Sequence, residues 1–412
     1  MPTARRSVIV FALTGIILLA LGIRTGVAAI APLASSMDLD VAMNGLPLGI
    51  LGTIPPIAYA LAAWFSPWFA QKVGLESAAM AVAVLGALAH VWRGISPSYL
   101  SLFVATAVLM VAAGVGNVIL PGLVKLYAPN SIGTMTAAYG MALAVSSSAP
   151  SFFGLWMADA AGWRVSLGAW AAISLVGIVP WLWVVSHAKM RGVSEAEIAA
   201  ALPVSPPLVS MSHSPTAVAI MIIFGVSGVM AYSWFALLPQ AMMELGGLSV
   251  ERAALALGIF TIMGFPLSLT IPHLASRSGW PGALVGIAVT CGLSGMLGLL
   301  LAPTLAPFLW AVLLGLGPLT FPLSLALIGY RTKNHLTALV LSGYVNKLGY
   351  LIAAAGPLVV GFVLQATGAW TLSIMFLMVV TLLEIPAIWV LAKERIVDDE
   401  LAEHGLSAHM SS

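Results

Sequence analysis

Apolar residues fill long stretches of the chain, and clusters of polar residues separate these stretches at short intervals. Most stretches reach about 20 residues, the length that a helix needs to cross roughly 30 Å of hydrocarbon. They are too long for barrel strands, and the alternation of period two that marks a strand is absent. The pattern predicts an all-α integral membrane protein with twelve spans, at residues 8–32, 46–70, 76–92, 99–124, 134–158, 165–187, 215–241, 251–275, 282–301, 305–328, 336–364 and 370–392.

Three groups of residues in the first half recur in the same order in the second half. The pairs are Pro67, Ala70, Lys72 and Gly74 with Pro272, Ala275, Arg277 and Gly279, displaced by 205; Gly114, Gly116 and Pro121 with Gly315, Gly317 and Pro322, displaced by 201; and Pro150 and Gly154 with Pro357 and Gly361, displaced by 207. We therefore predict two bundles of six helices, at 1–187 and 215–412, joined by a linker at 188–214 that is rich in Pro, Ser and Ala. Duplicated apolar halves are typical of secondary transporters, in which the substrate site lies between the halves.

The composition supports a bilayer environment. Hydrophobic residues make up 61% of the chain and charged residues 7%, whereas soluble domains carry roughly a quarter charged residues. The single cysteine, Cys291, excludes a disulfide framework and a cysteine metal cluster. No histidine pair has the spacing of metal ligands, so we expect no metal. We also expect no other cofactor and no nucleic-acid partner.

The distribution of cations predicts the orientation in the membrane. With twelve spans both termini share one side, and that side collects eleven lysines and arginines, whereas the other side collects Arg93, Arg164 and Arg252. The positive-inside rule then places both termini in the cytoplasm. We expect the acidic residues Asp398–Glu400 near the C-terminus to be solvated.

Arg24 lies in the body of the first predicted span and Lys347 near the middle of the eleventh, whereas the other lysines and arginines lie at or beyond the ends of the spans. A cation in a membrane helix costs several kcal/mol unless it faces a wet cavity or a partner, so it usually marks a pathway. Glu384 is the one acidic residue at clear membrane depth, which leaves two cations and one carboxylate. An anionic substrate can supply the missing charge. The alternatives are a structural Arg24 bonded to backbone carbonyls or reaching the interface, and a Glu384 that is either a proton-coupling residue or a structural buried carboxyl.

Other polar and aromatic residues in the spans are further candidates for contacts with a substrate. Asn117 follows Gly114 and Gly116, where small residues let helices approach and an amide can bond to a ligand or across the gap. Tyr350 lies three positions after Lys347, on the same helical face. Tyr139 in the fifth span and Trp234 in the seventh complete the candidate set. The alternative for the aromatic residues is packing or lipid contact.

The chain resembles the major facilitator superfamily in its two halves, its twelve spans, its central cytoplasmic loop and its turns of a cation followed by a glycine after the second and eighth spans. Within that superfamily, several strings resemble the cyanate permease and nitroimidazole transporter family of bacteria: Arg24 with Pro32-Leu33, Gly116-Asn117-Val118 with Leu120-Pro121 and Lys125, Gly162-Trp163-Arg164, Leu341-Ser342-Gly343, Gly349-Tyr350, Ala353-Ala354-Ala355-Gly356-Pro357 with Gly361, and Thr367-Gly368 with Trp370. The resemblance covers nearly the whole chain. It implies a protein of the bacterial cytoplasmic membrane that carries cyanate or another small anion or weak acid.

Two positions depart from the pattern of these families. Gln71 stands where the superfamily usually has an acidic residue before the cations of the turn, so the gating salt bridge of that acid is not expected here. Lys347 stands in a region where the resemblance implies an uncharged residue, often glutamine. A lysine there favours a substrate that is more firmly anionic than a neutral nitroimidazole.

These residues lead to one hypothesis of mechanism and to rivals of other classes. The two halves alternate access to a site where Arg24 and Lys347 attract the anion while Asn117 and Tyr350 orient it. A membrane-embedded enzyme would need a nucleophile, metal ligands or paired carboxylates at one depth, and the sequence has no such constellation. A sensor would be expected to carry a soluble domain. An exporter of lipophilic drugs or nitroimidazole-like compounds stays open, because the 19 methionines suit promiscuous pockets.

Overall fold

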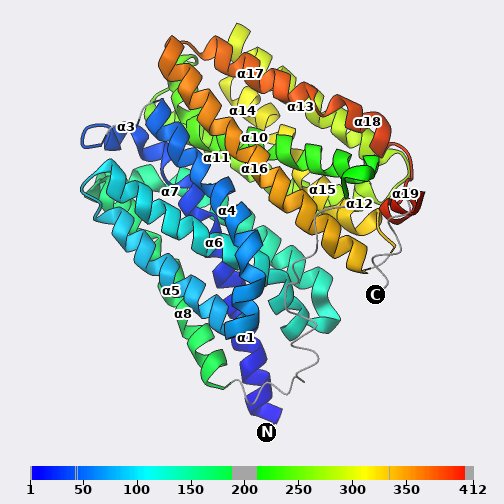
Figure 1. Ribbon diagram of the computed structural model, residues 1–412. Helices are drawn as coiled ribbons and strands as arrows, with labels where there is room; N and C mark the ends of the chain where they lie inside the picture. Colours follow the sequence, from blue (N-terminus) through cyan, green and yellow to red (C-terminus); the bar gives the residue numbers. More distant parts are fainter. Residues whose placement is uncertain (1, 42, 44, 188–210, 334, 404–412) are drawn as a thin grey trace. The chain divides into compact units, whose positions relative to one another are not determined.

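The protein is folded almost entirely into helices. The computed structural model describes residues 2–41, 43, 45–187, 211–333 and 335–403, and the described residues contain no strand (Figure 1). The predicted all-α membrane fold is therefore confirmed. Residues 188–210, which make up most of the predicted linker, lie outside the described residues.

The helix bounds follow the apolar stretches of the sequence. The helices before residue 188 are α1 (Pro2–Ile23), α2 (Thr25–Ala28), α3 (Ala34–Met37), α4 (Leu46–Val73), α5 (Leu75–Gly94), α6 (Tyr99–Tyr127), α7 (Ile132–Ala169) and α8 (Ala171–Ser186). The helices after residue 210 are α10 (Pro215–Glu244), α11 (Val250–Ile262), α12 (Gly264–Ala275), α13 (Trp280–Leu301), α14 (Pro307–Leu316), α15 (Thr320–Tyr330), α16 (His335–Thr367), α17 (Trp370–Leu382), α18 (Ile385–Leu391) and α19 (Val397–Glu403).

Eleven segments of the described chain are long and apolar enough to cross a membrane. One of them, Thr134–Ser186, has 53 residues. At 1.5 Å per residue it would extend about 80 Å as one helix, more than twice the thickness of the hydrocarbon layer. Gly162 interrupts it with φ 85° and ψ 158°, which are not helical values. This segment therefore supplies two spans, as the sequence predicts for 134–158 and 165–187.

The chain divides into two compact units. Unit 1 comprises Met1–Met43 and Leu61–Val204, and unit 2 comprises Asn44–Ala60 and Ser205–Ser412. Helix α4 is continuous from Leu46 to Val73, so its first part belongs to unit 2 and its second part to unit 1. In unit 1, α5 packs against α6 and α8, and α1 packs against α6, α7 and α8.

The turns of the chain repeat between its halves. Every described residue with a positive φ is a glycine, as expected for a backbone region that side chains disfavour. The six glycines form three pairs at displacements close to those of the sequence repeats: Gly45 with Gly247 (202), Gly74 with Gly279 (205) and Gly162 with Gly368 (206). The sequence motifs indicate a duplication, and the glycine turns between helices repeat at nearly the same displacements.

A tryptophan–carboxylate hydrogen bond is also repeated, once inside each unit. Trp163 Nε1 donates to Asp40 Oδ2 at 3.0 Å in unit 1, and Trp370 Nε1 donates to Glu244 Oε2 at 2.8 Å in unit 2. Asp40 follows the first predicted span and Glu244 is the last residue of α10. Their partners stand at the other end of each repeat, Trp163 just before the sixth predicted span and Trp370 at the start of α17. Asp40 also accepts from Arg164 Nη1 at 2.6 Å, and the hydrogen bonds from Arg164 and then Trp163 hold the pKa of Asp40 below its ordinary value.

Helices α10 and α16 make the most extensive helix–helix contact in unit 2 and lie side by side in Figure 1. A Cβ on Gly349 would lie 2.3 Å from the Phe224 ring, and one on Gly228 would lie 2.5 Å from the Cβ of Ala353. The two helices run parallel, because the contact of Phe224 with Gly349 is followed, further along both helices, by the contact of Gly228 with Ala353. Small residues permit such an approach in membranes, where van der Waals contact rather than the hydrophobic effect holds helices together.

The prediction that Asp398–Glu400 is solvated is wrong for Glu400, whereas Asp399 is exposed. These residues belong to α19, and Glu400 is 5% exposed. Its carboxylate accepts hydrogen bonds from the Thr216 N–H at 3.1 Å, from Thr216 Oγ1 at 2.9 Å and from Ser214 Oγ. Glu400 thus caps the N-terminus of α10, where free N–H groups and the helix dipole favour a negative charge. We call α19 and its partners the C-terminal clasp.

The two aspartates of the clasp bind a second part of unit 2. Asp398 accepts from the Lys333 N–H and from Thr337 Oγ1, both at 2.7 Å, and Lys333 Nζ lies 2.5 Å from Asp399 Oδ1. Lys333 precedes α16, so the clasp holds the starts of both α10 and α16. The sequence could not show this because the partners are 61 to 186 residues apart.

We expect the Glu400→Ala variant to unfold at a lower temperature than the parent protein. The change leaves the Ser214 and Thr216 donors without their buried carboxylate, a loss of about 1 to 3 kcal/mol. Thermal unfolding in detergent measures the effect. Glu403→Ala, on an exposed position of the same helix, is the control, and equal melting temperatures for the two variants would contradict the clasp.

Candidate functional site

Arg24 lies where the first span is interrupted. It separates α1 from α2, and its N–H donates to Ser146 Oγ of α7 at 3.0 Å. Its carbonyl accepts from the N–H groups of Val27 and Ala28 at 3.2 and 3.4 Å. An interrupted helix in a membrane needs such partners, because lipid cannot satisfy the freed backbone groups. The half-buried Arg24 therefore stands at a polar break within an apolar helix.

Asn117 and Tyr139 belong to the helices that pack near this break. A Cβ on Gly116 would lie 3.1 Å from Ile23, so Asn117 lies at the same level as Arg24 inside unit 1. Asn117 is half-buried and makes no hydrogen bond to any described residue. Tyr139 lies seven residues before Ser146 on α7, about 10 Å along the axis. The structure thus sets Arg24 and Asn117 at one level of unit 1 and leaves Tyr139 two turns away along α7.

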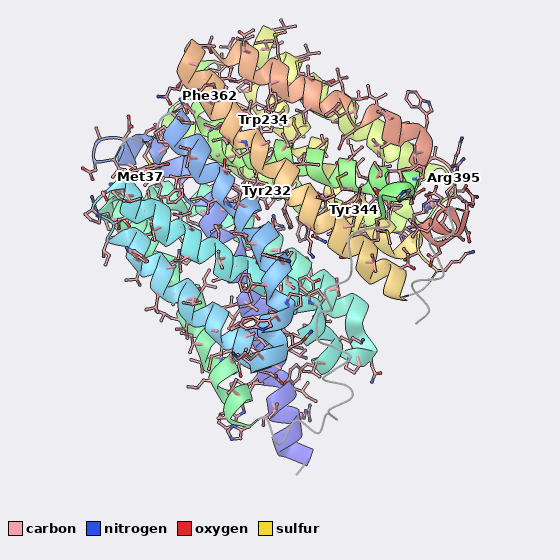
Figure 2. The ribbon with its side chains drawn as sticks, viewed as in Figure 1. Met37, Tyr232, Trp234, Tyr344, Phe362 and Arg395 are labelled. Carbon is pink, nitrogen blue, oxygen red and sulfur yellow. The ribbon has the colours of Figure 1, made fainter. Side chains whose placement is uncertain are left out.

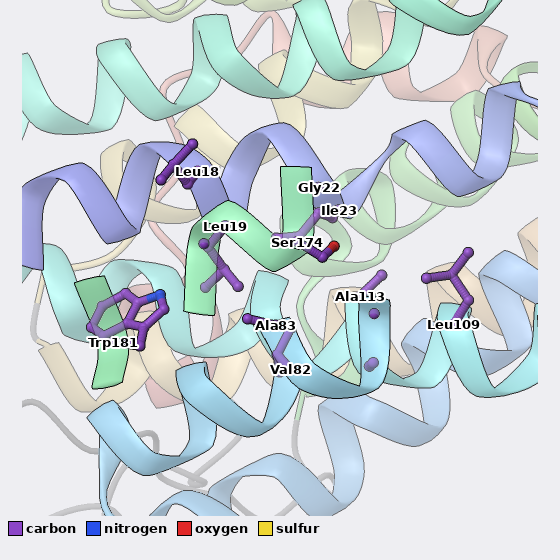
Figure 3. Close-up of a pocket in the computed structure, with 13 residues that line it drawn as sticks. Leu18, Leu19, Gly22, Ile23, Val82, Ala83, Leu109, Ala113, Ser174 and Trp181 are labelled. Carbon is purple, nitrogen blue, oxygen red and sulfur yellow. The ribbon is translucent and has the colours of Figure 1, made fainter. Parts of the chain in front are cut away.

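Unit 1 also contains a small, partly open cavity between α1, α5, α6 and α8 (Figure 3). Its volume is about 20 Å³, and most of its lining is apolar. Ser174 and Trp181 add polar atoms, and the indole Nε1 of Trp181 has no partner among the described residues. A cavity of this size holds about one water molecule, so it is too small for an organic substrate.

Lys347 lies in unit 2, in the body of α16. It is half-buried and forms no hydrogen bond or ion pair with any described residue. Its neighbour Asn346 donates back to the Ser342 carbonyl at 2.8 Å and so does not serve as its partner. Within the described chain, the structure therefore presents an ammonium group inside an apolar helix with no acidic residue paired to it.

Tyr350 lies three residues after Lys347 and is 3% exposed. Its ring makes edge-to-face contacts with Phe224 at 5.0 Å and with Tyr59 at 5.6 Å, measured between ring centroids. Phe224 also contacts Phe321 at 5.2 Å. These four residues of unit 2 form an aromatic cluster, which fixes the Tyr350 ring on the helix that carries Lys347.

Trp234 is far from Lys347 along the packed helices α10 and α16. Trp234 lies level with Pro357, as the contacts of its neighbours show. Ser233 lies against Gly356, and both Ala236 and Pro357 lie against Gly52. Lys347 lies ten residues before Pro357, which is about 15 Å along the axis. In Figure 2, Trp234 lies toward the Phe362 end of α16, and Tyr344 lies toward the other end. The structure therefore does not bring Trp234 and Lys347 together, and Trp234 Nε1 is buried without a described partner.

Glu384 lies at the break between α17 and α18 and is 2% exposed. Its Oε1 accepts from Thr320 Oγ1 at 3.0 Å. Thr320 begins α15 directly after a 3₁₀ turn, Gly317–Leu319, which interrupts the tenth span. No described basic residue lies within ion-pair distance of Glu384. The interrupted tenth span and the break between α17 and α18 thus meet at the buried carboxyl group of Glu384.

Arg93 is buried, although the distribution of cations predicts that it lies outside the membrane. The structure buries this residue completely in the last turn of α5, and its Nε, Nη1 and Nη2 atoms have no partner among the described residues. His90, one turn earlier on α5, is also fully buried. The spacing of three residues between two basic side chains on an apolar helix was the available signal.

Comparison with known proteins supports the transporter architecture. The chain matches the Major Facilitator Superfamily over residues 12–354. It is 27% identical over 374 residues to an uncharacterized transporter of Bacillus subtilis, YycB, across 89% of both chains. It is 27% identical over 374 residues to the 2-nitroimidazole transporter of Escherichia coli (90% of this chain, 92% of that one). It is 22% identical over 388 residues to the cyanate transport protein CynX of the same species (91% and 98%).

Solved structures share the fold at low sequence identity. A mutant of the nucleoside transporter NupG superposes with a TM-score of 0.72 at 13% identity, over 93% of this chain and 100% of that chain. A D-xylose–proton symporter superposes with a TM-score of 0.67 at 15% identity, over 95% and 99%. These similarities concern the arrangement of helices alone.

We expect Tyr350→Ala to lower the free energy of unfolding by about 3 kcal/mol, because it removes a ring that is packed between Phe224 and Tyr59. Tyr350→Phe keeps the ring and should unfold close to the parent temperature. Tyr330→Ala, at a half-exposed tyrosine of unit 2, is the matched control. Thermal unfolding compares the three variants. A Tyr350→Ala protein as stable as Tyr330→Ala would contradict a structural role for the cluster.

Proposed function

Because the chain belongs to the Major Facilitator Superfamily, we propose that it carries a small anion or weak acid across the membrane by alternating access. The protein is a multi-pass membrane transporter and not an enzyme. For its cargo we propose cyanate or another small organic or inorganic anion. We place it in a bacterial cytoplasmic membrane with both termini inside, with the halves 1–187 and 215–412 as the moving bodies.

Lys347 is the observation that carries the proposal. An ammonium group in an apolar helix is costly unless a counter-charge or water accompanies it, and no described residue supplies that counter-charge. A transported anion would supply it while bound. The substrate would then stabilise the state that encloses it, because it makes charge-assisted hydrogen bonds there.

The other candidates receive roles that fit their surroundings. Arg24, at the break of the first span, is the second cation that attracts the anion. Asn117 has an amide without a described partner, and Tyr350 has a ring fixed by packing, so both suit the orientation of a ligand. We assign Tyr139 and Trp234 to the lining of the pathway, away from the cation of their own unit.

A second function is favoured by one relative and one structural feature. The Escherichia coli relative is a 2-nitroimidazole transporter. Trp234 offers a buried indole, and its neighbours Tyr232, Phe235 and Phe260 form a chain of ring contacts at 6.4 and 5.6 Å. An exporter of lipophilic or nitroimidazole-like compounds would use this aromatic wall instead of Lys347.

We propose protons as the coupling ion and Glu384 as their carrier. The carboxyl group is enclosed at two helix breaks and has a hydroxyl group, not a cation, as its described partner. An acid in that position can bind and release a proton when the surrounding helices move. The structural alternative is a permanently neutral carboxyl group that holds α15 and α18 together.

We expect Lys347→Met to lose most of the stabilisation by small anions and to lower their uptake about tenfold or more, because it removes the charge-assisted contact. Thermal-shift titrations with cyanate, nitrate, formate and lactate, followed by uptake into proteoliposomes, measure both effects. Lys393→Met, at an exposed lysine, is the control. If neutral nitroimidazoles alone stabilise the parent and the Lys347→Met variant equally, the anion carrier is excluded and the exporter takes its place.

We expect Glu384→Gln to abolish the accumulation of substrate driven by a pH gradient, while substrate binding and exchange across the membrane persist. The amide keeps the size and the hydrogen bond of the side chain but cannot carry a proton. Thr320→Val, which removes the hydroxyl partner and keeps the acid, is the matched control. Gradient-driven accumulation by the Glu384→Gln protein at the parent level would rule out its role in coupling.

A further inference from the structure

Ser146 binds the backbone at the point where the first membrane span is interrupted. The Arg24 N–H donates to Ser146 Oγ at 3.0 Å, although the two residues are 122 positions apart in the chain. A continuous helix would pair this N–H with the carbonyl of Ala20, four residues earlier. Because lipid offers no acceptor, an N–H that leaves the helical pattern needs another one. The hydroxyl group of Ser146 supplies it from α7.

The two serines that follow Ser146 bond in a different way. Ser147 and Ser148 each donate to the carbonyl four residues earlier on α7, at 3.0 Å. Ser146 is 1% exposed, and its Oγ accepts from a different segment of unit 1. Pro150 stands four residues after Ser146 and has no N–H, so the Ser146 carbonyl lacks its helical donor. The hydrogen bonds of α7 are therefore interrupted at the residue that binds Arg24.

Unit 2 provides a comparison within the same chain. Pro150 recurs as Pro357, and Ala353 stands 207 residues after Ser146. Ala353 has no hydroxyl group, and its Cβ would lie 2.5 Å from a Cβ on Gly228 of α10. Helix α10, the first span of its half, is continuous from Pro215 to Glu244. Unit 1 thus combines a serine with an interrupted span, and unit 2 combines an alanine with a continuous one.

We propose that Ser146 is a positioning residue for the anion site, a role that rests on the proposed binding of substrate by Arg24. By accepting from the Arg24 N–H, Ser146 keeps the first span interrupted and fixes the backbone from which the Arg24 side chain extends. Arg24 is half-buried, whereas Ser146 is enclosed and acts through it. Without the hydroxyl group, the N–H regains an acceptor when the helix straightens, and this changes the direction of the Arg24 side chain.

We expect Ser146→Ala to weaken the binding of small anions about tenfold or more, because the substrate loses a well-placed hydrogen bond to a charged group. Thermal-shift titrations with cyanate and formate give the affinity, and uptake into proteoliposomes gives KM and the maximal rate. KM should rise by the same factor while the maximal rate stays within about twofold of the parent, because the lost contact contributes to substrate binding. Ser147→Ala, at a hydroxyl group that bonds within α7, is the matched control and should leave both unchanged.

A double-mutant cycle with Arg24 separates positioning from a general effect on the fold. In the Arg24→Gln protein the side chain to be positioned is gone, so adding Ser146→Ala should change the anion affinity no further. An equal additional loss in that background overturns the proposal, and so does parent affinity in Ser146→Ala alone. Unchanged anion affinity in Arg24→Gln would instead show that the binding role of Arg24 has failed, and the positioning role with it.

Ser146→Cys serves if Ser146→Ala does not fold. A thiol is close to a hydroxyl group in size but is a weak acceptor, so we expect anion affinity to fall in the same direction. The loss should again disappear in the Arg24→Gln background. Parent affinity in Ser146→Cys contradicts the positioning role.

Discussion

The cost of an unpaired polar group in hydrocarbon is the constraint on which the structure depends. It explains why the described chain is helical, and it explains what surrounds each interruption of a helix. The break at Arg24 is bonded to Ser146, and the break at Glu384 faces the hydroxyl group of Thr320. Lys347 and Arg93 are cations of apolar helices whose charges have no described partner. For the half-buried Lys347, a ligand is the physical explanation that we favour.

The two halves share a scaffold but not a chemistry. Paired glycine turns and the tryptophan–carboxylate bonds recur at displacements of 202 to 207 residues. Three charged groups within the helices do not recur: Gly298, Gly140 and Gly177 stand at the positions that correspond to Arg93, Lys347 and Glu384. The repeated features determine how helices pack and turn. The unrepeated side chains place Arg93 in unit 1 and Lys347 and Glu384 in unit 2.

Sequence patterns predicted only some residues of the candidate site. Depth along an apolar stretch was enough to select Lys347 and Glu384, because a charge stands out in a sequence of apolar residues. The same criterion failed for Arg93, because its place at the end of a stretch resembles an interfacial anchor. It was harder still to predict from the sequence which candidate residues lie close together. Trp234 and Lys347 are both in apolar helices, yet the parallel packing of α10 and α16 separates them by about 15 Å.

The sequence alone determined the membrane environment, the all-helical class, the positions of the spans and the internal duplication. These follow from local properties: hydrophobic length, absence of strand periodicity, and glycines and prolines at repeated intervals. Tertiary structure decided which side chains meet. The clasp joins Glu400 to Thr216 across 184 residues, and the burial of Arg93 depends on the approach of α7 to Gly94. Such contacts depend on how helices pack in three dimensions, and a linear pattern of apolar residues does not encode which helices become neighbours.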